Sequence, residues 1–117
     1  MNVIEQDIWT RWDAKQTIVV PTNGSINSRG LAVMGRGVAK QAAERFDKLR
    51  EMLASHLREN GNVPCVFMEQ NLITFPVKHE WHQYASLDLI KRSAALLVKI
   101  IDEHPGVKPV ACPKVGC

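Results

Sequence analysis

The sequence predicts an α/β domain in which helices cover the faces of a mixed, largely parallel sheet. Three observations support this fold class. Short apolar segments typical of strands alternate with long amphipathic segments typical of helices, which is the order of βαβ units. The length of 117 residues suits one compact domain, predicted to span 1–117. A content of 45% hydrophobic and 23% charged residues is that of a globular protein.

The first half of the chain predicts two strands and one helix. Val3–Asp7 is expected to be a short strand. Thr17–Pro21 is β-branched and continuously apolar, which indicates a central strand buried on both faces. In Val38–Glu59 apolar residues recur at helical spacing, and Asn60-Gly61 is a typical helix end.

The second half predicts three strands and a further helix. Val63–Met68 and Leu72–Val77 are expected to be short strands. Ser86 is a favourable N-cap for a helix that runs to about His104. Val107–Cys112 is the last apolar segment, so the predicted order is β-β-α-β-β-α-β.

Composition excludes several classes of protein. Fifteen Lys and Arg against twelve Asp and Glu give a net charge of +3, and this small excess argues against a nucleic-acid-binding domain. No apolar stretch approaches the roughly 20 residues of a membrane span, so no membrane partner is expected. Glu5 and Asp7 stand where a signal peptide would be basic and then apolar, so a cytoplasmic location is expected. The cysteines are odd in number and lack CxxC spacing, which predicts free or buried thiols at Cys65, Cys112 and Cys117.

The segment from Pro21 to Ala39 joins the central strand to a helix and is rich in glycine. Gly30, Gly35 and Gly37 allow the backbone to approach a ligand closely. A helix that begins near Gly37 offers unpaired N–H groups and the positive end of its dipole to phosphate oxygens. The segment therefore predicts a phosphate-bearing ligand, with glycines that serve turns alone as the alternative. It matches neither the P-loop nor the Rossmann fingerprint. Ligands of such sheets bind beyond the carboxyl ends of the strands, so this segment and Pro113–Cys117 are expected to form the site.

Three segments carry a resemblance to a known family: Val3–Ile8, Ile18–Asn23 and Ala32–Ala39. Together they resemble the macro domain, and most closely its branch with an MGxGxA loop. That branch includes ADP-ribose-1''-phosphate phosphatases and enzymes that remove ADP-ribose from glutamate or DNA. Val110–Cys117 resembles the start of the second phosphate-binding loop of the family. The likeness extends over the whole chain and implies a three-layer α/β/α fold.

The resemblance implies ligand-binding roles for individual residues. Asp7 would bind the adenine amino group with Ile8 beside the ring, although Gln6 replaces a glycine of the family and narrows this slot. Asn23 would reach the distal ribose; as alternatives, Asp7 and Asn23 are turn residues. The remaining residues would surround the diphosphate: Gly35, Arg36, Gly37, Val38, Val115 and Gly116. The resemblance implies no role for Asn27, Ser28 or Arg29.

Lys78 is the second catalytic candidate beside Asn23. In the glycohydrolase members a lysine at the corresponding strand end attacks the anomeric carbon of ADP-ribose, and only the neutral amine is nucleophilic. The alternatives are a surface lysine that closes a strand, or a phosphatase that needs no covalent lysine. His79 and His82 form an HxxH pair without a third ligand, so neither a metal nor another cofactor is expected. Trp81 is expected to pack at the rim of the site.

The family continues beyond Val115–Cys117 with a glycine-rich turn, an aspartate and a closing helix, none of which is in this sequence. The resemblance implies a domain incomplete at its C-terminal end, either truncated or completed by a partner chain. Apolar surface left by the absent helix predicts a homo-oligomer. The expected partners are ADP-ribose, ADP-ribose-1''-phosphate or an ADP-ribosylated macromolecule. The expected activity is that of an ADP-ribose-1''-phosphate phosphatase or an ADP-ribosyl hydrolase, with a non-catalytic ADP-ribose-binding module as the alternative.

Overall fold

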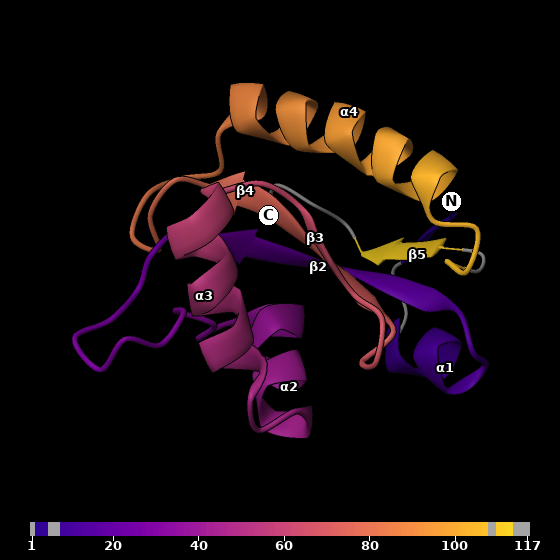
Figure 1. Ribbon diagram of the computed structural model, residues 1–117, viewed down its shortest axis with the longest axis horizontal. Helices are drawn as coiled ribbons and strands as arrows, with labels where there is room; N and C mark the ends of the chain where they lie inside the picture. The colour runs from indigo at the N-terminus through magenta and orange to yellow at the C-terminus, as the bar shows by residue number, and fades with distance from the viewer. Residues whose placement is uncertain (1, 5–7, 108–109, 114–117) are drawn as a thin grey trace.

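A computed structural model describes residues 2–4, 8–107 and 110–113 of the chain (Figure 1). In these residues five strands form one sheet in the order β1-β5-β2-β4-β3. Neighbouring strands are parallel except for β3, which runs antiparallel to β4. This arrangement confirms the predicted mixed, largely parallel sheet. The strands are β1 (Asn2–Ile4), β2 (Thr17–Asn23), β3 (Cys65–Phe67), β4 (Leu72–Lys78) and β5 (Val110–Pro113).

Helices cover both faces of this sheet and make the three layers that were expected. Figure 1 shows α4 along one face and the other three helices along the opposite face. Within the described residues these helices are α1 (Ile8–Asp13), α2 (Gly37–Arg45), α3 (Leu49–Asn60) and α4 (Leu87–Glu103). None of them combines the length and the apolar character that crossing a bilayer requires.

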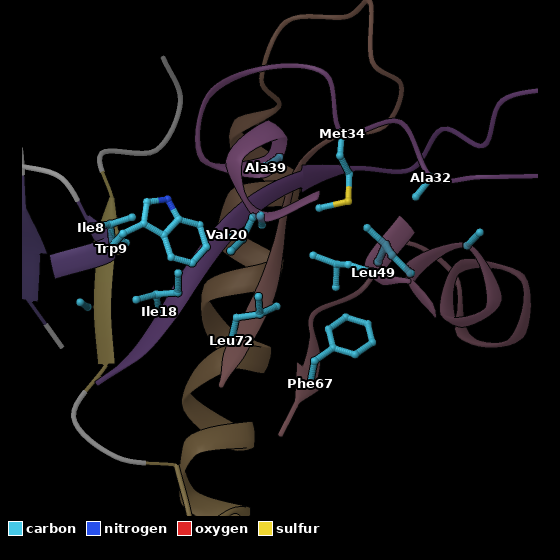
Figure 2. Close-up of a cluster of buried hydrophobic side chains, with 14 residues drawn as sticks. Ile8, Trp9, Ile18, Val20, Ala32, Met34, Ala39, Leu49, Phe67 and Leu72 are labelled. Carbon is cyan, nitrogen blue, oxygen red and sulfur yellow. The ribbon is translucent and has the colours of Figure 1, made fainter. Parts of the chain in front are cut away.

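Among the residues that the structure describes, the core consists of two hydrophobic clusters, one on each face of the sheet. Side chains alternate along a strand, so Ile18 and Val20 of β2 face α1, α2 and α3, where Leu49 of α3 and Trp9 of α1 pack (Figure 2). Val19 lies between them in sequence and belongs to the cluster beneath α4. All three β2 residues are fully buried, which confirms a central strand buried on both faces.

The prediction of a single helix over Val38–Glu59 is wrong, because this segment forms two helices, α2 and α3. Phe46 caps α2 in an extended conformation, with φ −126° and ψ 101°. Its ring packs against Trp9 and Trp12, at centroid distances of 6.4 and 5.7 Å. The bend lets α3 leave the direction of α2 while Leu49 still reaches the core.

Other boundaries also differ from the prediction. The sequence pattern did not indicate α1, a helix of only six residues that Trp9 fixes in the core. β3 is shorter than the predicted Val63–Met68, and β5 begins later than Val107. The last helix agrees closely with the prediction, since the Ser86 hydroxyl accepts a hydrogen bond from the Leu89 N–H at 3.3 Å. Residues 5–7 of the predicted first strand lie outside the described residues.

The cysteines provide a chemical test of this packing. Cys65 is half-buried, Cys112 is buried, and both are free thiols, as expected; Cys117 lies outside the described residues. Burial raises the pKa of both thiols, so less of the reactive thiolate is present at pH 7 than for an exposed cysteine. We expect Cys112 to be alkylated much more slowly in the native chain than in the chain unfolded by guanidinium chloride. Peptide mass spectrometry measures both rates. Equal rates in the two conditions would contradict the packing of β5.

Candidate functional site

A cavity of about 520 Å³ opens at the carboxyl ends of β2 and β4. Ligands bind at this edge in open α/β sheets, and it is the edge at which the sequence predicts a site. Three stretches of chain supply most of the wall: the end of β2, the segment 33–39 that leads into α2, and the end of β4. The lining residues that the sequence singled out are Asn23, Gly35, Arg36, Gly37, Val38, Lys78 and Trp81.

Asn23 holds together the two ends of the loop that follows β2. Its Oδ1 accepts a hydrogen bond from the Ser25 N–H at 2.9 Å, and its Nδ2 donates to the Val33 carbonyl at 3.1 Å. The Val33 N–H in turn donates to the Ser25 carbonyl at 3.1 Å. These bonds return the chain to the cavity before α2 begins. Asn23 thus has the turn role given as its alternative, and Nδ2 has a second N–H besides the one used here.

The middle of the same loop is fixed by residues for which the sequence predicts no role in the site. Asn27 Oδ1 accepts hydrogen bonds from the N–H groups of Arg29 and Leu31, at 2.9 and 3.0 Å. Two arginines of α3 reach the loop as well: Arg50 Nε donates to the Ala32 carbonyl at 2.8 Å, and Arg58 to the Gly30 carbonyl at 2.9 Å. Hydrogen bonds within the loop and from α3 therefore hold this loop in one conformation.

The N-terminus of α2 lines the cavity. Arg36 precedes the helix in an extended conformation, and its side chain makes no capping hydrogen bond. The first hydrogen bond of this turn is donated by the Lys40 N–H to the Arg36 carbonyl, at 3.1 Å. The N–H groups of Gly37, Val38 and Ala39 precede that bond, so they have no partner within the helix. Together with the positive end of the dipole, these donors suit an anion, as the glycine-rich segment predicts.

Lys78 at the end of β4 and Asn23 at the end of β2 are neighbours on adjacent strands. They are paired in the β2–β4 register, which shifts between Thr22 and Asn23 because one residue of β4 is skipped. Lys78 and Arg36 bring positive charge to the cavity, and the described lining residues include no Asp or Glu. This charge distribution favours a ligand with negative groups.

Trp81 lies at the rim of the cavity, as expected, with 57% of its surface exposed. Its backbone N–H donates to the Ser25 hydroxyl at 2.9 Å, which ties the segment after β4 to the loop after β2. His79 and His82 are exposed, and His82 Nε2 lies 3.8 Å from Glu80. Among the described residues no three His, Cys, Asp or Glu side chains gather to hold a metal ion.

The structure does not bring every predicted residue to this cavity. Ile8 begins α1 with 3% of its surface exposed, and its side chain packs in the core cluster instead of lining the cavity. An aliphatic side chain of this size lies there because α1 needs an apolar anchor on the sheet. Asp7, Val115 and Gly116 lie outside the described residues, so their roles stay predictions.

Comparison with known proteins rests on solved structures, since no protein-family model and no curated protein matches the chain. Thermosipho africanus DarTG in complex with ADP-ribose superposes with a TM-score of 0.75 at 17% identity, over 98% of this chain. The macrodomain of Mycobacterium tuberculosis DarG gives a TM-score of 0.75 at 22% identity over 98%. The macrodomain of Thermus aquaticus DarG gives 0.68 at 21% identity over 99%.

The chain therefore has the macro-domain fold, which confirms the fold that the resemblance implied. It spans 33% of the Thermosipho africanus chain, and 76% and 77% of the two macrodomain chains.

Proposed function

We propose that this chain binds ADP-ribose in the cavity between β2, α2 and β4. One observation carries the proposal: the N-terminus of α2, Asn23 and Lys78 all line one cavity of about 520 Å³. A ligand with a diphosphate and a sugar at one end would satisfy all three groups. The presence of ADP-ribose in the Thermosipho africanus protein, which shares the fold, supports the same choice.

The strand order supports one orientation of this ligand. β4 lies on one side of β2, whereas β5 and then β1 lie on the other side. The diphosphate would bind at α2, next to β2, and the distal ribose would extend toward Asn23 and Lys78 at β4. The adenosine half would then extend toward β5, whose Pro113 lines the cavity, and toward β1, which precedes Asp7 in the sequence.

The proposed reaction is hydrolysis of the bond between the distal ribose and a leaving group. The neutral Lys78 amine attacks the anomeric carbon, a C–N bond forms and the C–O bond to the leaving group breaks. The electron pair of that bond stays on the leaving oxygen, which takes the proton that the amine loses. Water then attacks the same carbon, so that a new C–O bond forms and the C–N bond to lysine breaks. The electron pair of that bond returns to the lysine nitrogen, which takes the proton that the water loses, and ADP-ribose and the neutral lysine are released. The second N–H of Asn23 would hold a ribose hydroxyl during both steps.

Titration calorimetry with ADP-ribose tests the binding directly, and Gly35 supplies a sharp variant. A Cβ at Gly35 would meet no protein atom within 4 Å, so packing does not require glycine there. In Gly35→Val the added side chain would lie along the cavity wall and keep a diphosphate away from the N–H groups of α2. Loss of those charge-assisted hydrogen bonds predicts affinity weaker by about tenfold or more. The free energy of unfolding is expected to change by less than about 0.5 kcal/mol.

Gly35→Ala is the graded control, with a smaller loss than the valine variant. Wild-type protein that shows no heat of binding, or a valine variant that binds like wild type, would contradict the proposed site. Binding without turnover of ADP-ribose-1''-phosphate, of an ADP-ribosylated peptide or of an ADP-ribosylated oligonucleotide would favour the non-catalytic module.

A further inference from the structure

Asn62 lies where the ends of β2 and β4 meet, although it comes from the segment between α3 and β3. Its Nδ2 donates a hydrogen bond to the Lys78 carbonyl at 2.9 Å. A Cβ placed on Gly24 would lie 3.0 Å from both Cγ and Nδ2 of Asn62, so the amide packs directly on that glycine. The Gly24 N–H donates to the His79 carbonyl at 3.1 Å. The Asn62 amide therefore contacts the residue after Asn23 and the peptide after Lys78.

The orientation of this amide is determined by its partner. A carbonyl only accepts hydrogen bonds, so the nitrogen of Asn62 must face Lys78 and the oxygen must face away. That oxygen, Oδ1, is buried and has no hydrogen-bond partner among the described residues. A buried acceptor without a partner opposes folding, and violations of this kind are concentrated at functional sites. The Asn62 amide thus supplies a donor to the Lys78 carbonyl and leaves its own buried oxygen unsatisfied.

We propose that Asn62 is the positioning residue of Lys78, an inference that rests on the proposed function. The β2–β4 register shifts between Thr22 and Asn23, so the regular ladder does not by itself determine the path of β4 at its last residue. The bond from Asn62 fixes the peptide plane that follows Lys78. A fixed peptide fixes the direction in which the lysine side chain leaves the strand, and so the place of its amine in the cavity.

Two substitutions remove the hydrogen bond in different ways. Asn62→Ala removes the amide, whereas Asn62→Asp keeps its shape and turns the donor into an acceptor that repels the Lys78 carbonyl. Both variants are expected to release ADP-ribose from an ADP-ribosylated substrate about tenfold to 100-fold more slowly, since small misplacements of a reacting group have effects of this size. The Kd for ADP-ribose is expected to stay within about threefold, because the α2 donors are untouched. The Tm of Asn62→Ala is expected to fall by no more than about 4 °C.

Asn60→Ala is the matched control, because Asn60 is an exposed amide at the end of α3 that pairs with His56 at 3.1 Å. A double-mutant cycle separates positioning from a general structural effect. If Asn62 acts through Lys78, Asn62→Ala has no further effect on the rate in a Lys78→Ala background. Additive effects, or Asn62 variants that behave like Asn60→Ala, would overturn the inference.

The outcomes distinguish this inference from the proposed function. A wild-type chain that does not bind ADP-ribose would overturn both. If the wild-type chain binds ADP-ribose without turnover, NMR of the lysine side chains tests whether Asn62 positions Lys78. ADP-ribose should then shift the Lys78 Cε–H signal in wild type and in Asn60→Ala, and the shift should be lost in Asn62→Ala. Retention of the full shift in Asn62→Ala would overturn the positioning role alone.

Discussion

Lys78→Ala is expected to slow the release of ADP-ribose from an ADP-ribosylated substrate by about 1000-fold or more, because loss of a covalent nucleophile has effects of this order. The Kd for ADP-ribose should change far less, since the diphosphate donors of α2 remain in place. Single-turnover measurements at saturating enzyme give the rate, and calorimetry gives the Kd. Together the two values separate a loss of chemistry from a loss of binding.

Lys78→Arg distinguishes two roles of the lysine. Arginine keeps the positive charge but stays protonated and cannot act as a neutral nucleophile. If Lys78 attacks the anomeric carbon, the arginine variant is as slow as the alanine variant. If Lys78 only stabilises negative charge while water attacks phosphorus, the arginine variant keeps most of its activity on ADP-ribose-1''-phosphate.

Lys91→Ala is the matched control for these variants, because Lys91 is an exposed lysine of α4, and α4 lies on the face opposite α2 (Figure 1). It is expected to act like wild type. A Lys78→Ala variant that turns over every substrate at the wild-type rate would remove the lysine from the reaction altogether.

The sheet and the place of the site could be predicted because both leave local signals. β2 is continuously apolar and β-branched, and α4 has its N-cap and a helical period, so their types follow from neighbouring residues alone. The glycine-rich segment lies after a buried strand, and in a parallel sheet that position is the ligand-binding edge. Lys78 reaches the same cavity because its strand is the parallel neighbour of β2.

The parts that could not be predicted depend on contacts between residues far apart in the sequence. The break before α3 follows from the packing of Phe46 on Trp9 and Trp12, more than thirty positions earlier. Arg50 and Arg58 brace the loop after β2 from eighteen and twenty-eight positions away. Asn62 bonds the backbone of Lys78 across sixteen positions. Each of these side chains is ordinary in its local sequence, and only the fold gives it a partner.

Leu97→Ala is expected to lower the free energy of unfolding by about 3–4 kcal/mol, because it removes buried methyl groups and leaves a cavity. Leu97 has 1% of its surface exposed and belongs to the cluster that joins α4 to Val19 and Ile73 of the sheet. Among the described residues, the buried side chains of that cluster all come from α4 and from the strands that it covers. For a domain whose whole stability is on the order of 5–15 kcal/mol, this loss is large.

Val98→Ala is the matched control on the same helix, since Val98 has 57% of its surface exposed. Alanine also favours a helix more than valine does, so the change is expected to be within about 0.5 kcal/mol and stabilising if measurable. Urea unfolding followed by circular dichroism measures both variants, and an unchanged m-value shows that the change lies in stability. The Tm of Leu97→Ala should fall by roughly 10–15 °C. Equal stability of the two variants would mean that α4 does not pack on the sheet through Leu97.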